Sequence, residues 1–258
     1  MHLLLTNCNT TEAMTEDMAA AARTAATPGT EITALTPAWG PESCEGWLDS
    51  FISAAAVLDA LTTAPEAVGP FDAVVMSGFG EHGRQAAREL LDVPVVDITE
   101  AAAHLALLIG ERFAVVTSLS RTAPLIEESL RGSGLIERCH AIDAVDLPVL
   151  ALDADPDRTA AAFAGPARAA VAAGADVIVL GCAGMAGLRE RLEADCGVPV
   201  VDGVGAAVVL AEGLVRLALV TGRAHGYAHP LPKVRRGWPV SAALGRSAVV
   251  HRPPAYRS

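Results

Sequence analysis

The chain lacks the cysteine and histidine patterns that mark several large classes of protein. Five cysteines occur among 258 residues, an odd number without a CxxC pair, so neither a disulfide framework nor a zinc motif is predicted. The seven histidines form no HExxH motif, and we expect no metal. The glycine-rich turns do not read as the GxGxxG signature of dinucleotide sites. We therefore expect no cofactor.

Long apolar runs and basic residues are also scarce. No run reaches the roughly 20 apolar residues that a membrane helix needs. The first residues, MHLLLTNCNTT, lack the basic region and long apolar stretch of a secretory signal. We therefore expect a cytoplasmic protein that does not contact a membrane. The formal net charge of −11 argues against nucleic acid as a partner.

The carboxyl-terminal segment departs from this acidity. From residue 226 to the end the chain contains no acid. The basic side chains of residues 233–258 are Lys233, Arg235, Arg236, Arg246, Arg252 and Arg257. We interpret 233–258 as a basic extension that is solvated or docked on a partner.

Two stretches of the chain nearly repeat each other. Residues 72–102 begin with DAVVMSGFGEHG and end with VPVVDITEAA, and residues 176–207 begin with DVIVLGCAGMAG and end with VPVVDGVGAA. Each stretch reads as an apolar strand, a glycine-rich turn, a helix and a second apolar strand that ends in a polar turn. The second turn holds Cys182 at its centre, and the first holds Gly78 at the same place.

Short apolar strands alternate with helices along the whole chain, which is typical of βαβ units and parallel sheets. Apolar residues make up 52% of the sequence, ample for buried cores. We expect an α/β fold of two pseudo-symmetric lobes, each a doubly wound, mostly parallel sheet flanked by helices. Lobe 1 takes residues 1–98 plus 207–222, and lobe 2 takes residues 99–206.

Three local features are also predicted. Thr10 or Thr11 is expected to cap the helix after the first strand with its side chain. A helix is predicted from Leu48 to Leu61, and a last helix from Ala206 to Thr221.

The polar turns that follow the strands are the predicted binding site. In open parallel sheets a ligand lies beyond the carboxyl ends of the strands, so these turns should converge on a cleft between the lobes. The turns are residues 6–11, 77–83, 117–122 and 181–187. We expect a small-molecule substrate there.

Cys182 is the candidate for chemistry in this cleft. It lies between a strand and a helix, with Gly181 and Gly184 as small neighbours that let a substrate approach. A helix N-terminus can lower the pKa of a thiol below its reference of about 8.5, and such a thiol can act as a general base, a general acid or a nucleophile. Cysteine is also a small residue that is often simply buried, and spacing alone leaves both interpretations open. Cys139 and Cys196 lie outside such turns and are interpreted as structural.

Candidate donors lie in the turns of both lobes. Side-chain and backbone groups there can hold a carboxylate or an imide, although the same residue types also form turns and caps. The donors are Asn7, Asn9, Thr10, Thr117 and Ser118. Ser43 and Glu45 are further candidates for the pocket lining.

The chain resembles the aspartate/glutamate/hydantoin racemase superfamily, and most closely its hydantoin and allantoin racemase branch. The resemblance covers about residues 1–235, and its most specific part is GCAGM around Cys182. The segments that carry it are NCNTT (7–11), GPESCE (40–45), FGEHG (79–83), VTSLSR (116–121), VLGCAGM (179–185), VPVVDGV (198–204) and YAHP (227–230).

This resemblance implies a cofactor-independent enzyme with two cysteines, one per lobe, that face each other across the α-carbon of the substrate. Cys182 matches the second cysteine, while the first falls at Gly78. Cys8 stands where the family usually has proline. The resemblance also implies a homo-oligomer and a substrate pocket that includes the neighbours of these two positions: Ser77, Phe79, Gly181, Ala183 and Gly184.

Gly78 cannot supply a proton on the face opposite Cys182, and three interpretations follow. Another residue of that wall, His82, Cys8 or Glu81, replaces the missing cysteine. Alternatively, the chemistry is one-sided, as in arylmalonate decarboxylase, a relative that is similar in having a lone cysteine in its second lobe. In the third interpretation the protein binds a small molecule without turnover. We favour the first, a racemase or epimerase that acts at an acidic α-carbon of a hydantoin-like or amino-acid-derived molecule.

Overall fold

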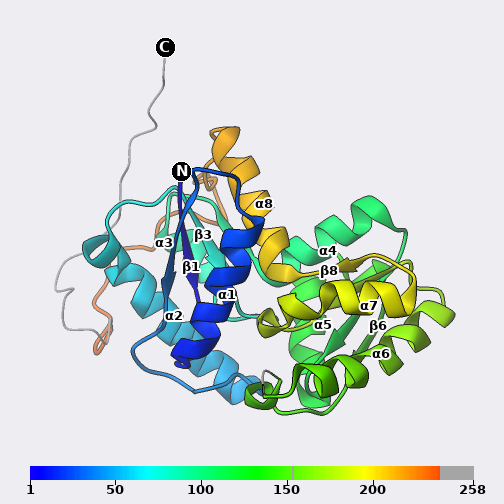
Figure 1. Ribbon diagram of the computed structural model, residues 1–258. Helices are drawn as coiled ribbons and strands as arrows, with labels where there is room; N and C mark the ends of the chain where they lie inside the picture. The colour runs from blue at the N-terminus through cyan, green and yellow to red at the C-terminus, as the bar shows by residue number, and fades with distance from the viewer. Residues whose placement is uncertain (153, 239–258) are drawn as a thin grey trace.

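The computed structural model describes residues 1–152 and 154–238, which form two lobes (Figure 1). The first sheet contains β1 (His2–Thr6), β2 (Glu31–Leu35), β3 (Ala73–Met76) and β4 (Val95–Asp97) in the order β2-β1-β3-β4. The second contains β5 (Phe113–Thr117), β6 (Cys139–Ala144), β7 (Val177–Leu180) and β8 (Val200–Val201) in the order β6-β5-β7-β8. All of these pairs are parallel. The predicted α/β fold class is confirmed, and the repeated strand order shows the pseudo-symmetry.

Helices flank both sheets. In the first lobe they are α1 (Glu12–Ala25), α2 (Trp47–Val68) and α3 (Arg84–Leu90), and in the second they are α5 (Ala123–Gly132), α6 (Pro156–Ala172) and α7 (Arg189–Cys196). Four short 3₁₀ turns are η1 (Ser120–Thr122), η2 (Ile136–Arg138), η3 (Val149–Ala151) and η4 (Ala183–Leu188). The helices α4 (Ile98–Ile109) and α8 (Gly203–Arg216) pack against each other between the lobes, and α8 also packs on α1 and β3.

The central strands are buried along their whole length, because helices cover both faces of a parallel sheet. Every residue of β3 and β7 is buried, and so is every residue of β5. Leu3 pairs with Ala73 in the first sheet, and Phe113 pairs with Val177 in the second. Because all four of these strands run in the same sense within their sheets, the turns that follow them emerge at one edge of each lobe.

The helix α2 is longer than predicted. The sequence predicts an end at Leu61, because Thr62, Thr63 and Pro65 are poor helix formers, but the helix continues to Val68. The extension is stabilised by packing, since Leu61 and Ala64 are buried in the first-lobe core. By length and mean hydropathy alone, 1.3, this helix would also pass for a membrane span, but its inner face packs on the first sheet (Figure 1).

The predicted side-chain cap of the first helix and the predicted bounds of the last helix, which ends at Arg216 rather than Thr221, need correction. Thr11 is the residue before α1, but no side-chain cap bond forms there, since its hydroxyl donates to the carbonyl of Glu42. The Oδ1 atom of Asn9 instead accepts the N–H of Thr11 at 2.9 Å. The last helix begins at Gly203 rather than Ala206, because the Asp202 carboxylate accepts the N–H groups of two following residues.

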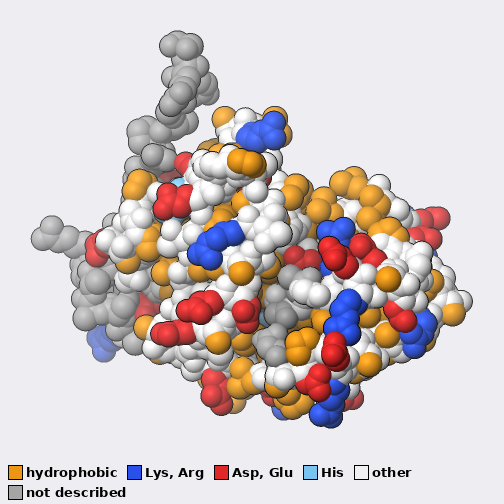
Figure 2. Space-filling view, viewed as in Figure 1, with side chains coloured by type: hydrophobic (Ala, Val, Ile, Leu, Met, Phe, Trp, Pro, Cys, Tyr) orange, Lys and Arg blue, Asp and Glu red, His pale blue; other side chains and the backbone are white. Residues whose placement is uncertain are grey.

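The segment after α8 is docked on the first lobe. Arg223 Nε lies 2.8 Å from the Asp92 carboxylate, and the Tyr227 hydroxyl donates to Gln85 of α3 at 2.5 Å. Residues 239–258 of the predicted basic extension lie outside the described residues. On the face shown in Figure 2, basic side chains lie singly among acidic ones.

A buried arginine ties the lobes together. Arg84, the first residue of α3, is 1% exposed. Its Nη1 atom lies 3.2 Å from Asp97 Oδ1 at the end of β4, and it donates to Ser129 Oγ of α5 at 3.2 Å. Asp97 also caps α4 by accepting the N–H groups of Thr99 and Glu100. Burial raises the pKa of Asp97 to about 7, although the neighbouring guanidinium of Arg84 opposes this rise.

Replacing Asp97 with alanine should remove the fully buried carboxylate partner of Arg84 and leave its charge to the partly exposed Glu81 and Glu100. We expect Asp97→Ala to lower the free energy of unfolding by about 3 kcal/mol, the lower end of the cost of removing one partner of a buried ion pair. The matched control is Asp202→Ala, because Asp202 caps α8 in the same way but does not pair with a buried arginine. It should cost about 1 kcal/mol, as for a lost helix cap. Urea unfolding followed by circular dichroism measures both, and equal losses would contradict the role assigned to the pair.

Candidate active site

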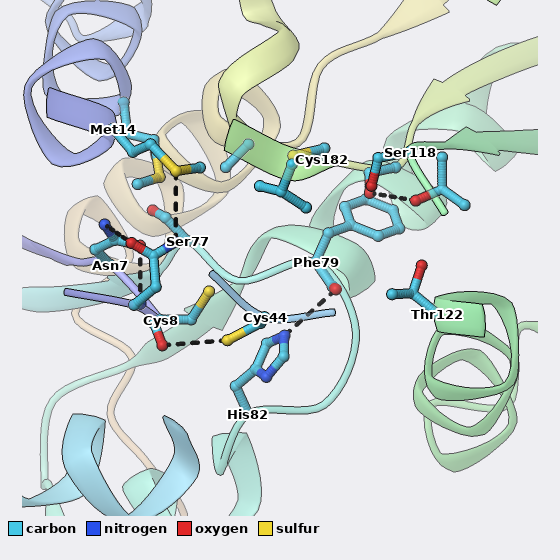
Figure 3. A pocket seen from close by; sticks show the side chains of 16 residues that line it. Asn7, Cys8, Met14, Cys44, Ser77, Phe79, His82, Ser118, Thr122 and Cys182 are labelled. Atoms are coloured by element: carbon cyan, nitrogen blue, oxygen red, sulfur yellow. Dashed lines mark hydrogen bonds between the residues drawn. The ribbon is translucent and has the colours of Figure 1, made fainter. Parts of the chain in front are cut away.

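The carboxyl ends of β1, β3, β5 and β7 meet at a small cavity between the lobes, with a volume of about 40 Å³ (Figure 3). Both lobes line it. Of the predicted site residues, those that line it are Asn7, Asn9, Ser77, Phe79, His82, Thr117, Ser118, Gly181, Cys182 and Ala183. The turns converge here because the parallel strands of each sheet end at the same edge, and the two edges face one cavity.

The lining does not include the predicted residues Thr10, Ser43 and Glu45. The Thr10 hydroxyl donates to the carbonyl of Pro41, and Ser43 lies in the same loop. Gly184 lies in η4, beyond Cys182. The Glu45 carboxylate accepts the N–H of Val149 from the other lobe at 3.2 Å, so it joins the lobes.

Glu81 is turned away from the cavity. Its Oε1 atom accepts the N–H groups of Gly83 and Arg84, at 2.9 and 3.0 Å. Its Oε2 atom lies 3.3 Å from the Arg84 guanidinium. The carboxylate is therefore engaged at the start of α3, which leaves Cys8 and His82 as the candidates to replace the missing cysteine.

Some lining residues had no predicted role. They are Met14, Met18, Cys44 and Val149. Thr122 also lines the cavity and belongs to the predicted turn 117–122. The two methionines stand four residues apart, a spacing that places both on one face of α1. Cys44 lies in the loop before α2, and no local pattern marks it, because only the tertiary fold brings that loop to the cavity.

Gly78 lies behind two side chains of the cavity wall. A Cβ atom built on Gly78 would lie 2.4 Å from Cδ2 of His82. It would also lie 2.7 Å from Cβ and 3.0 Å from Sγ of Cys8. The space that a cysteine at this position would need is therefore filled by Cys8 and His82.

Any side chain at position 78 should displace these neighbours. We expect Gly78→Ala to lower the free energy of unfolding by about 1–3 kcal/mol, the usual cost of overpacking. Adding His82→Ala should restore part of this loss, because the closest contact is removed. A double-mutant cycle by urea unfolding measures the coupling, and additive effects would contradict the crowding.

The thiols of Cys8 and Cys44 and the imidazole of His82 form a cluster on one side of the cavity, and Cys182 lies on the other (Figure 3). One ligand atom from each of the three residues lies within 4.8 Å of the others. The Cys44 thiol donates a hydrogen bond to the backbone carbonyl of Cys8 at 3.4 Å. Interaction with the Cys44 side chain, together with burial, holds the pKa of Cys8 well above its usual value. Interaction with the Cys8 side chain lowers the pKa of Cys44. Burial lowers the pKa of His82, so its ring is neutral.

The thiols should differ in reactivity. Because the pKa of Cys44 is lowered and burial raises that of Cys139 to about 12, Cys44 should carry the larger thiolate fraction near neutral pH. We expect iodoacetamide to modify Cys44 before Cys139, as measured by peptide mass spectrometry across a pH series. Urea-unfolded protein is the control, in which both should react with a pKa of about 8.5. Equal rates in the folded protein would contradict the assignment.

The predicted donors differ in how free they are to bind a ligand. The Asn7 amide donates to Asn9 and Thr15, so its role is to hold the turn. Asn9 Oδ1 accepts from Asn7 and Thr11, whereas Nδ2 donates, among the described residues, only to the weak acceptor Met14 Sδ at 3.6 Å. Ser77 Oγ is buried and has no hydrogen-bond partner among the described residues. A buried hydroxyl without a partner is costly, which makes Ser77 the best placed donor for a substrate oxygen.

The arrangement suits proton transfer. Thiols of Cys182 and Cys8 approach the cavity from different lobes, and the charge of Cys182 contributes to the raised pKa of Cys8. Donors from Ser77 and Asn9 line the same cavity. A carbon acid in this space would meet one thiol on each side and donors for the oxygen of its carbanion.

Comparisons with known proteins point the same way. The sequence profile described as Asp/Glu/hydantoin racemase matches residues 3–211. Hydantoin racemase from Rhizobium meliloti is 40% identical over 243 residues, which cover 94% of this chain and 100% of that protein. The crystal structure of allantoin racemase from Pseudomonas fluorescens has 50% identity and a TM-score of 0.89, covering 91% of this chain and 99% of that one. Allantoin racemase from Klebsiella pneumoniae has 40% identity and a TM-score of 0.87, covering 92% and 97%.

Proposed function

Since this chain belongs to the Asp/Glu/hydantoin racemase family and is an isomerase of the racemase type, we propose that it inverts the acidic C5 carbon of hydantoin rings without a cofactor. Hydantoins and allantoin, the molecules named for its relatives, share this ring. The observation that carries the proposal is the pair of thiols, Cys182 and Cys8, that line one cavity from different lobes.

The chemistry needs one proton acceptor and one proton donor on opposite faces of the ring. The C5–H bond is acidic because the adjacent C4 carbonyl takes up the charge as an enolate-like oxyanion. The Cys182 thiolate removes the proton from one face, and the Cys8 thiol returns a proton to the other. The roles exchange for the opposite enantiomer.

Cys8 takes both roles in turn. Interaction with the Cys44 side chain and burial raise the pKa of Cys8, so the thiol, which is an acid, is favoured at rest. Once it has given its proton to the substrate, the Cys8 thiolate is the base for the opposite enantiomer.

Ser77 and Asn9 are the proposed donors for the oxyanion. A donor aimed at the developing charge contributes about 10²–10³ in rate in comparable sites. The cavity of about 40 Å³ has room for only a few water molecules. A ring therefore enters when lining side chains move, and Met14 and Met18, unbranched and flexible, are suited to this.

The Cys8 thiol also weighs against the two alternative functions. One-sided decarboxylation needs a single proton donor, and a binding protein needs none. A second thiol packed where a cysteine at position 78 would lie favours proton transfer on both faces.

Cysteine variants separate the two faces. We expect Cys182→Ser and Cys8→Ser each to lower racemisation of enantiopure 5-substituted hydantoins and allantoin by at least about 10³-fold, because each removes one proton carrier. In deuterium oxide, Cys8→Ser should still exchange the C5 proton of one enantiomer with retained configuration. Proton NMR and polarimetry measure both.

The matched control is Cys196→Ser, a cysteine at the end of α7 and outside the cavity lining, which should keep wild-type rates. Full turnover in Cys182→Ser would sink the proposal. Full racemisation in Cys8→Ser would show that Cys8 takes no part in the mechanism and that another group carries the proton on the face opposite Cys182.

A further inference from the structure

We propose that Cys8, Cys44 and His82 form a binding site for a soft divalent cation, with Zn²⁺ as the best fit, and that an occupied site stops proton transfer at Cys8. Two sulfurs and one imidazole nitrogen are the ligands that zinc prefers. They lie within 4.8 Å of one another in the wall of the cavity. Only the second half of the proposal rests on the function proposed above.

The geometry is close to that of a zinc site with an open position. With bonds of about 2.3 Å to sulfur and about 2.0–2.1 Å to nitrogen, tetrahedral ligand atoms stand roughly 3.4–3.8 Å apart. The cluster therefore needs a contraction of about an ångström or less. Three protein ligands leave the fourth position open. All three line the cavity, which Cys182 lines from the other lobe.

His82 is in the state that binds metals. Its ring is neutral because burial lowers its pKa, and neutral imidazole is the ligand form. Nδ1 is buried without a hydrogen-bond partner among the described residues, and Nε2 makes only a long contact of 3.4 Å to the Phe79 carbonyl. One of these ring nitrogens lies within 4.8 Å of both sulfurs, and neither of them has a short hydrogen bond among the described residues that a cation would have to displace.

Gly78 makes the cluster possible. The absence of Cβ at this position lets the His82 ring and the Cys8 side chain approach each other. The ligands come from three separate segments: the turn after β1, the loop before α2 and the turn after β3. For that reason no spacing motif in the sequence announces the site.

Binding is a proton exchange without oxidation. Both S–H bonds break, two Zn–S bonds form, and any protons that the thiols held go to the solvent. A Cys8 sulfur bound to Zn²⁺ carries no proton and has given its electron pair to the metal. It can then neither donate a proton to the substrate nor accept one from it, so racemisation stops until the cation leaves.

Cobalt spectroscopy tests the site directly. The full chain, reduced and freed of metal by a chelator, is titrated with Co²⁺ and then with Zn²⁺. We expect one Co²⁺ per chain with a thiolate-to-cobalt charge-transfer band and tetrahedral d–d bands, which Zn²⁺ abolishes. Cys44→Ser and His82→Gln should weaken Zn²⁺ binding by more than the roughly 10–100-fold that loss of a supporting residue costs.

Cys196→Ser is again the matched control and should bind like the wild type, and circular dichroism verifies that every variant is folded. Absence of the thiolate band in the wild type would overturn the site. So would a Cys44→Ser variant that binds as tightly as the wild type.

Activity tests the second half. Stoichiometric Zn²⁺ should lower racemisation by the wild type, and a chelator should restore it. Racemisation that Zn²⁺ leaves unchanged or raises would overturn the inhibition. A chain that shows the thiolate band but never racemises keeps the metal site and refutes the proposed function, whereas one that racemises without the band does the reverse.

Discussion

The buried positive charge of Arg84 needs acceptors from both lobes, and the contacts that it makes with them join the two lobes. A guanidinium that is 1% exposed is tolerated only when carboxylates and carbonyls surround it. Asp97 and Glu81 of the first lobe and Ser129 of the second meet this need. Asp97 at the same time starts α4, the helix that leads into the second lobe. Arg84 therefore binds the turn that contains Glu81, the Asp97 carboxylate at the start of α4, and Ser129 of the second lobe.

The same requirement shapes the chemistry of the cavity. Because the Glu81 carboxylate is engaged with Arg84, it cannot serve as the acid of the first-lobe wall. What remains on that wall is uncharged or sulfur-based: the thiols of Cys8 and Cys44 and the neutral ring of His82. Proton transfer through sulfur is thus the chemistry that this wall can offer, and Gly78 gives the room for it.

Proton transfer and metal binding are two uses of one property. A thiol can act as an acid and its thiolate as a base, and the same thiolate is a good ligand for a soft cation. A second thiol and an imidazole beside Cys8 strengthen both uses. The proposed racemase and the proposed zinc site therefore compete for the same sulfur, which makes the cation a natural antagonist of the reaction.

The sequence by itself determined the two-lobed parallel fold, the place of the cavity and the position of Cys182 at its edge, because strand periodicity, turn chemistry and the internal repeat are local properties. It did not determine the length of α2, which depends on packing of Leu61 and Ala64. Nor did it reveal that Glu81 faces Arg84, or that Cys44 reaches Cys8 and His82. The second contact joins residues that are distant along the chain, and the first depends on the direction of one side chain. Only the tertiary structure decides either of them.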